Sequence, residues 1–255
     1  MRISISSIRC FKSCRRLWEL QYKEDLQAVN KREALETGVS YHNKIDEIYR
    51  NGYFTPENDE DAFSKTSAMA LAYEKYIYPK FKVDKTEEWF TVKLNDKHTL
   101  VGRYDGISDG YIVEHKTTSG AIDESYEYGL EWDEQILAYM LASGKRKIFY
   151  TVVKKPTIRL CKNETEEDFF NRMCKWYDED TDSKIKVLEI TRTDEEVEAF
   201  RDELIKMADE MENCTNFYKV PSHCKMWGTM CEFAPICKHY DPNQDYIEFK
   251  RREYD

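Results

Sequence analysis

The spacing of apolar and polar residues predicts an order of helices and strands along the chain. Apolar residues recur every three or four positions over most of the chain, as in amphipathic helices, but they form short alternating runs from residue 87 onward, as in strands. This order predicts a mixed α/β domain with a central mixed sheet flanked by helices. Helices are predicted at residues 8–22, about 32–50, 58–79, 132–143, 165–179 and 193–213. Strands are predicted at residues 87–94, 99–107, 111–118, 147–153 and 184–192, with a further candidate at 157–162.

Local signals set the boundaries of these elements. Ser4 or Ser6 is expected to cap the first helix, and Asn51 with Gly52 to end the second. Two turns, over residues 95–97 and 108–110, join the first three strands into consecutive hairpins.

The second hairpin carries charges where a buried strand pair normally carries apolar residues. Asp105 and Glu114 lie on adjacent strands on either side of the turn, so the hairpin is expected to bring the two carboxylates together. Two buried like charges repel strongly unless a cation lies between them, and Mg²⁺ or Mn²⁺ prefers such oxygen ligands. Lys116 follows Glu114 by two residues, on the same face of its strand. This set suits phosphodiester hydrolysis; the alternative is a surface ladder of ion pairs on an edge strand.

Two other segments supply compatible residues. His42, in "GVSYH", is a metal ligand of a suitable type, although a histidine there could equally belong to the core. Gln135 and Tyr139, in "EQILAY", lie one helical turn apart on a face that can turn to the sheet, where a tyrosine could also be simple core.

In the order "GVSYH", "LVGRYDGI", "IVEHKTT" and "EQILAY", the chain resembles the RecB-like branch of the PD-(D/E)xK nuclease superfamily, which includes CRISPR-adaptation nucleases. The resemblance covers most of the chain and implies a restriction-endonuclease-like core forming a single domain over residues 1–255. It implies metal ligation by His42, Asp105, Glu114 and the backbone carbonyl of His115. It also implies Lys116 as the catalytic lysine, with Gln135 and Tyr139 as supporting, DNA-contacting residues of the site.

Eight cysteines point to a second metal centre. We expect no secretory signal, because the first residues include no apolar segment followed by a small-residue cleavage site. No apolar run is long enough to cross a bilayer, so we expect an intracellular, cytoplasmic protein with reduced thiols and no membrane partner. By the resemblance, that cell is bacterial, archaeal or phage-infected. Clustered cysteines in a reducing compartment favour a metal over disulfides.

In the iron-bearing relatives, one cysteine near the N-terminus and three near the C-terminus hold a [4Fe-4S] cluster, which needs four thiolates. Cys14, Cys224, Cys231 and Cys237 match these positions, with Arg15 where a proline often follows the first cysteine. The cluster would join the N-terminal and C-terminal segments of the domain. Within the domain, residues of about 30–80 form a helical segment and residues of about 214–255 form a cysteine-bearing tail.

Other readings of the cysteines stay open. Cys224, Cys231 and Cys237 with His223 or His239 could form a Cys3His zinc site, or the cysteines could be buried free thiols. Cys10 could replace Cys14, whereas Cys161 and Cys174 are expected in the core.

Composition narrows the function. A formal charge of −10 argues against a protein that coats DNA with a general basic surface. The first helix is nevertheless basic, through Arg9, Lys12, Arg15 and Arg16. It could neutralise phosphates while Trp18 or Tyr22 stacks on bases, or it could be a solvated helix face.

Together these features predict a metal-dependent DNA nuclease, specifically an exonuclease on single-stranded DNA ends, with other DNA-processing proteins as candidate partners. The alternatives are a non-catalytic DNA-end-binding module and a zinc-stapled interaction protein.

Overall fold

The computed structural model describes residues 1–29, 33–56, 58–226, 228–241, 244, 246 and 249–251. The chain divides into two compact units. The first comprises Met1–Arg32, Thr91–Gly102 and Phe200–Asp255, and the second comprises Glu33–Phe90 and Arg103–Ala199.

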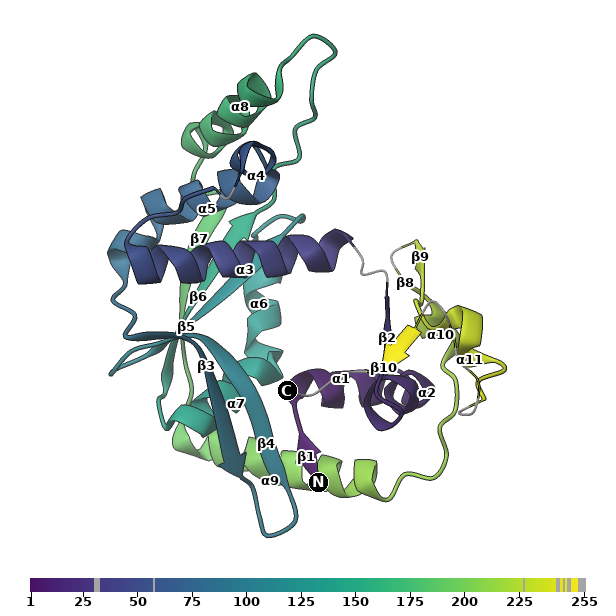
Figure 1. The fold of residues 1–255 in the computed structure, drawn as a ribbon. Helices are drawn as coiled ribbons and strands as arrows, with labels where there is room; N and C mark the ends of the chain where they lie inside the picture. The colour runs from purple at the N-terminus through teal and green to yellow at the C-terminus, as the bar shows by residue number, and fades with distance from the viewer. Residues whose placement is uncertain are drawn as a thin grey trace. The chain divides into compact units, whose positions relative to one another are not determined.

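A mixed sheet organises the second unit, as the sequence predicts (Figure 1). Antiparallel pairing joins β4 to β5 with Gly106 opposite Val113, and parallel pairing joins β5 to β6 with Glu114 opposite Tyr150. Strand β7 runs antiparallel to β6, while β3 pairs with β4. The strands are β3 (Lys85–Lys93), β4 (Thr99–Ile107), β5 (Ile112–Thr118), β6 (Lys147–Lys154) and β7 (Ile185–Thr191). The end of β3 and the start of β4 belong to the first unit, where β1 (Arg2–Ile3) pairs parallel with β4.

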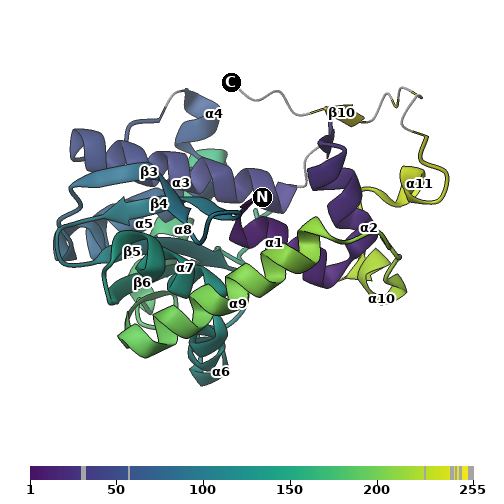
Figure 2. The ribbon, with the colours of Figure 1, turned by 90° about the horizontal axis from the view of Figure 1, so that it is seen from below.

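Helices cover both faces of this sheet (Figures 1 and 2). Alternate side chains of β6 point to opposite faces. Val153 therefore packs with Tyr41 and Tyr73 from α3 and α5, whereas Ile148 packs with Ile136 from α7. The helices of this unit are α3 (Glu33–Asn51), α4 (Asp59–Ala62), α5 (Lys65–Tyr76), α6 (Glu124–Gly129), α7 (Glu134–Ser143) and α8 (Glu166–Glu179), with 3₁₀ turns η2 (Tyr78–Lys80) and η3 (Leu130–Trp132).

The predicted end of α3 is confirmed, and its predicted start at Arg32 lies outside the described residues. Gly52 adopts a left-handed φ of 86° and donates its N–H to the carbonyl of Ile48 at 2.8 Å. The single helix predicted from Asn58 is wrong, because the Ser64 side chain caps a new helix by accepting the N–H of Ser67 at 3.1 Å.

The candidate strand at residues 157–162 does not form. Local bonds hold this segment as a loop: the N–H of Cys161 donates to the Glu164 carboxylate at 2.9 Å, and Arg172 pairs with the same carboxylate. Cys161 is exposed and Cys174, on α8, is half-buried, so neither is the core residue that the sequence predicts.

In the first unit, the predicted continuous helix over residues 8–22 is wrong. Helix α1 is capped by Ser4, but Cys14 is extended, with φ −159° and ψ 109°. The N–H of Arg16 then donates to the carbonyl of Tyr218, far along the chain, at 3.2 Å. The helices at this end are α1 (Ile5–Ser13), α2 (Arg15–Trp18) and the π-helix η1 (Glu19–Lys23).

The tail of the chain returns to the beginning within this unit. Strand β10 pairs antiparallel with β2, and Phe233, Ile236 and Phe249 pack with Leu20 and Leu26. The remaining strands are β1 (Arg2–Ile3), β2 (Leu26–Ala28), β8 (Lys225–Met226), β9 (Thr229–Met230) and β10 (Phe249–Arg251). The remaining helices are α9 (Asp194–Glu212), whose residues from Phe200 onward belong to this unit, α10 (Pro221–Cys224) and α11 (Ala234–Cys237). Across the described part of the chain, none of the helices has the length and apolarity to span a membrane.

Candidate active site

The residues predicted for the nuclease site all lie in the second unit. They come from α3, the end of β4, the middle of β5 and one face of α7. In chain order they are His42, Asp105, Glu114, His115, Lys116, Gln135 and Tyr139.

Asp105 occupies the point where β4 stops pairing with β5. The ladder between these strands ends at Gly106, and the Asp105 carboxylate accepts the N–H of His115 at 2.8 Å. Its other oxygen lies 3.4 Å from Nδ1 of His42, which α3 holds above the sheet. The structure therefore brings His42 and Asp105 together.

Glu87 on β3 joins these two residues, and the sequence analysis missed it. One donor atom from each of His42, Glu87 and Asp105 lies within 4.8 Å of the others. Glu87 adopts a φ of 51°, the left-handed region that non-glycine residues avoid. Its carboxylate pairs with Nε of Arg103 at 2.7 Å. Backbone strain of this kind is often retained where it positions a functional side chain.

Glu114 lies beside this group and faces Lys116. Only 1% of Glu114 is exposed, and one of its carboxylate oxygens pairs with the Lys116 ammonium. The other oxygen is buried without a hydrogen-bond partner. A buried carboxylate oxygen left in this state is costly, so it fits a cation that would complete its coordination.

Gln135 and Tyr139 connect α7 to the site through one chain of hydrogen bonds. Lys116 donates to the Gln135 amide oxygen at 3.2 Å, and the Gln135 amide nitrogen donates to the Tyr139 hydroxyl at 2.7 Å. That hydroxyl donates in turn to the carbonyl of Arg103 at 2.7 Å. The structure thus fixes the position of Lys116 from α7.

Charge coupling sets the protonation of the carboxylates. Burial and the neighbouring Asp105 raise the pKa of Glu114 to about 8. Burial also opposes ionisation of Asp105, but His42 outweighs it and the pKa of Asp105 is lowered. Two carboxylates this close do not both ionise readily without a cation.

The basic groups of the site differ in their charge. Burial opposes protonation of His42 and Lys116, but Asp105 and Glu114 outweigh it and raise both pKa values. His115 is different: burial lowers its pKa to about 3, so its imidazole is neutral, with Nδ1 2.9 Å from the Thr151 hydroxyl. His115 is therefore a packed core histidine, and its backbone carbonyl remains the predicted ligand.

Trp18, Arg15 and Arg16, three of the side chains predicted to contact DNA, are engaged within the protein, whereas Arg9 and Lys12 of α1 are exposed. Trp18 is buried, donates to the Ser7 hydroxyl at 2.9 Å and stacks on Phe217, so it is not available to bases. Arg15 pairs with Glu210, and Arg16 pairs with Glu19. These contacts favour a structural role for this segment.

The cysteines predicted to hold the cluster, Cys14, Cys224, Cys231 and Cys237, lie within the first unit. In the part of the chain that the structure describes, no cysteine belongs to a group of three or more candidate ligands whose donor atoms lie within 4.8 Å of one another. Tetrahedral zinc with bonds of ~2.3 Å would hold sulfurs about 3.8 Å apart. A single zinc site is thus not preassembled among those residues.

The thiols nevertheless act on one another electrostatically. Burial raises the pKa of the Cys231 thiol, and Cys237 and Cys14 add to that rise. Burial likewise raises the pKa of Cys237, where Cys14 and Cys224 add to the rise.

A mixed sheet that presents a Glu-x-Lys strand, an acidic neighbour and a Gln/Tyr helix defines a restriction-endonuclease-like core. A model of the PD-(D/E)XK nuclease superfamily matches residues 2–238, and the chain belongs to that superfamily.

Solved structures of other proteins resemble the chain at low sequence identity. A putative exonuclease from Eubacterium rectale matches with a TM-score of 0.55 and 12% identity, covering 96% of this chain and 90% of that one, which shows the fold alone. An alkaline exonuclease from Laribacter hongkongensis matches with a TM-score of 0.36 and 12% identity, covering 83% and 90%. A phage-related exonuclease from Haemophilus somnus matches with a TM-score of 0.40 and 15% identity, covering 83% and 93%. A comparison with curated proteins found no match.

Proposed function

We propose that the chain is a Mg²⁺- or Mn²⁺-dependent deoxyribonuclease of the RecB-like type that acts as an exonuclease on single-stranded DNA ends. One observation carries the proposal: His42, Glu87 and Asp105 converge beside Glu114, whose free oxygen is buried without a partner. The donor set of carboxylates and one imidazole suits a hard divalent cation.

Each residue has a defined task in this proposal. Asp105, Glu114, His42 and the carbonyl of His115 hold the cation, and Glu87 orients His42 or adds a ligand. A bound divalent cation lowers the pKa of its water and polarises the phosphate. Lys116, held by Gln135, donates to the oxygens on which negative charge develops during hydrolysis.

The choice of an exonuclease on single strands rests on the family resemblance and on the fold. The solved structure that matches with a TM-score above one half carries the name putative exonuclease. Single-stranded ends, DNA-processing protein partners and a single functional domain over residues 1–255 stay predictions.

A digestion time course tests the activity. Single- and double-stranded DNA labelled at either end is incubated with the protein and Mg²⁺ or Mn²⁺, and with EDTA as the metal-free control. Lys116→Ala should lower the rate of cleavage by about 10²–10³-fold, whereas Lys147→Ala, which removes a half-exposed lysine paired with Glu189 on the same sheet, should leave it unchanged. Binding without cleavage would favour the DNA-end-binding alternative.

We also propose that Cys14, Cys224, Cys231 and Cys237 hold a [4Fe-4S] cluster. The proximity of three of these cysteines supports the proposal: the N–H of Cys231 donates to the carbonyl of Cys224 at 2.8 Å, and Cys231 and Cys237 pack against one hydrophobic cluster. A four-iron cluster separates its thiolates more than one zinc ion does. Lys219 and Arg16 act on Cys237 and would offset thiolate charge.

Colour and metal content test this second proposal. Protein purified without oxygen should be brown with about four irons per chain, and Cys14→Ser should bleach it. Cys161→Ser, at an exposed cysteine, should stay brown. If Cys14→Ser keeps its colour and Cys10→Ser is bleached, the N-terminal ligand is Cys10 rather than Cys14. A colourless parent protein that contains zinc would contradict the cluster.

A further inference from the structure

Trp89 is an exposed aromatic residue that packing does not explain. Its side chain leaves β3 two residues after Glu87, and 68% of the residue is exposed. An indole left in water sacrifices the burial that normally stabilises large aromatic side chains. Such a ring near a candidate active site therefore suggests a contact with a ligand.

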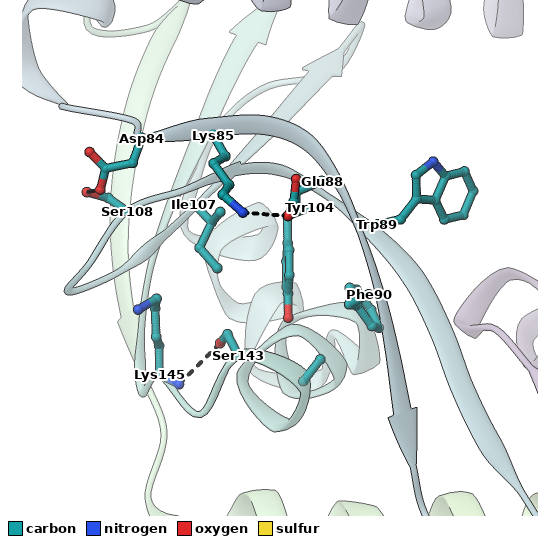
Figure 3. A pocket seen from close by; sticks show the side chains of 11 residues that line it. Asp84, Lys85, Glu88, Trp89, Phe90, Tyr104, Ile107, Ser108, Ser143 and Lys145 are labelled. Carbon is teal, nitrogen blue, oxygen red and sulfur yellow. Dashed lines mark hydrogen bonds and ion pairs between the residues drawn. The ribbon is translucent and has the colours of Figure 1, made fainter.

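The Trp89 ring faces solvent on the side of β3 opposite to the side chain of Phe90. Phe90 packs on Tyr104 with ring centroids 4.6 Å apart, at a cavity of about 360 Å³. Trp89 lies at the edge of that cavity and projects from β3 away from Tyr104 (Figure 3). The alternation of β3 thus gives Phe90 to the protein interior and Trp89 to solvent.

Arg103 links Trp89 to the candidate metal ligands. Its guanidinium carbon lies 5.5 Å from the centroid of the Trp89 ring, and its Nε pairs with Glu87 at 2.7 Å. The Arg103 side chain is 49% exposed, so a solvent-accessible cation adjoins an exposed ring. Glu87 belongs to the group with His42 and Asp105. Contacts therefore connect the Trp89 ring to Arg103, and Arg103 to the candidate metal ligands.

We infer that Trp89 stacks on an unpaired base of single-stranded DNA while Arg103 contacts an adjacent phosphate, so that the strand is held beside the metal ligands. This inference rests on the proposed nuclease function and names its substrate contact. A stacking platform of this kind requires a base whose face is accessible, which a continuously stacked duplex does not offer. In a chain with a formal charge of −10, a local arginine is also needed to attract phosphate.

A binding experiment with abasic oligonucleotides tests the stack. Lys116→Ala protein holds DNA uncut in Mn²⁺, and fluorescence anisotropy gives its Kd for a labelled twelve-nucleotide thymidine strand and for strands with one abasic nucleotide at successive positions. We expect one position where loss of the base weakens binding about ten-fold. With Trp89→Ala added, binding to the intact strand should weaken by a similar factor, and that position should lose its effect.

Matched variants separate stacking from general damage. Trp132→Ala removes another exposed tryptophan, at 72% exposure on η3, and should leave every Kd unchanged. Trp89→Phe should restore most of the binding. Affinity for blunt duplex DNA should change less than two-fold in Trp89→Ala.

The inference is overturned if Trp89→Ala binds all strands like its parent, or if the abasic position keeps its full effect without the ring. Equal losses for duplex and single strands would also overturn it. If the inference is overturned but the protein with Lys116 intact still cleaves DNA, the nuclease function stands. If that protein neither binds nor cleaves DNA, the proposed function itself fails.

Discussion

Glu114→Gln should remove a pH dependence that the buried carboxyl imposes on the stability of the protein in EDTA. The folded protein raises the pKa of Glu114 from 4.5 to about 8, by burial and by the charge of Asp105. Between these values the folded state keeps a proton that the unfolded state has released, so the metal-free protein loses stability as pH rises. Above pH 8 both states have lost the proton, and this contribution becomes constant.

The size of the effect follows from the pKa. Between pH 6.5 and the folded pKa of about 8, the free energy of unfolding falls by about 1.36 kcal/mol per pH unit. Over these roughly 1.5 pH units the parent therefore loses about 2 kcal/mol, and it loses no more up to pH 8.5. Glutamine keeps the shape of the side chain but carries no charge, so the variant should lose this part of the pH dependence. Asp105 also raises the pKa of His42, so His42 adds a further loss of stability as pH rises. This loss should remain in Glu114→Gln.

Urea unfolding in EDTA at pH 6.5, 7.5 and 8.5 measures the difference. The free energy of unfolding of the parent should fall by about 2 kcal/mol more than that of Glu114→Gln. Glu127→Gln, at a carboxylate paired with Lys186 on a half-exposed surface, should follow the parent. Saturating Mn²⁺ should reverse the parent's trend, because the cation binds the ionised carboxylate. A parent whose stability is flat over this range, or a variant that keeps the full slope, would refute the reasoning.

Three further substitutions test the remaining parts of the site. Lys116→Ala should lower kcat for DNA cleavage by about 10²–10³-fold, measured in single-turnover digestions, and a smaller effect on kcat than on KM would contradict its assigned role. Glu87→Gln should weaken Mn²⁺ binding in calorimetric titrations by about 10–100-fold, and an unchanged Kd would exclude Glu87 from the metal site. Tyr139→Phe should cost about 1–3 kcal/mol of unfolding free energy, because it leaves the Gln135 amide and the Arg103 carbonyl without their partner; a neutral result in urea unfolding would show that water replaces the hydroxyl.

The elements around the hairpin could be predicted because their signals are local. Strand β4 has the predicted bounds, Thr99–Ile107, since alternating apolar residues and the turn at residues 108–110 leave little choice of register. The mixed sheet and the Asn51–Gly52 helix stop were predictable for the same reason.

Features that depend on distant contacts could not be predicted. The break at Cys14 depends on a bond between Arg16 and Tyr218, and periodicity alone favours a continuous helix there. The burial of Trp18 against Phe217 depends on the same return of the chain. The sequence predicts a continuous surface helix over residues 8–22 because the residues that these side chains contact are remote in sequence.

The candidate metal group shows the same limit. Asp105 was accessible to sequence reasoning, since an acidic residue inside a strand pair is unusual. Glu87 was not, because its place beside His42 requires a left-handed backbone that no residue in "EEWFTVKL" signals. A glutamate on a strand is otherwise typical of a solvated face.

The central claim is that this site hydrolyses DNA with a divalent cation held by His42, Asp105 and Glu114. The most direct measurement is the digestion of end-labelled single-stranded DNA by the parent and by Asp105→Asn, with Mn²⁺ varied from zero to saturation. The account predicts cleavage by the parent that rises with Mn²⁺ and disappears in EDTA, and no cleavage by Asp105→Asn at any concentration. Cleavage by the parent in EDTA, or full cleavage by Asp105→Asn, would contradict it.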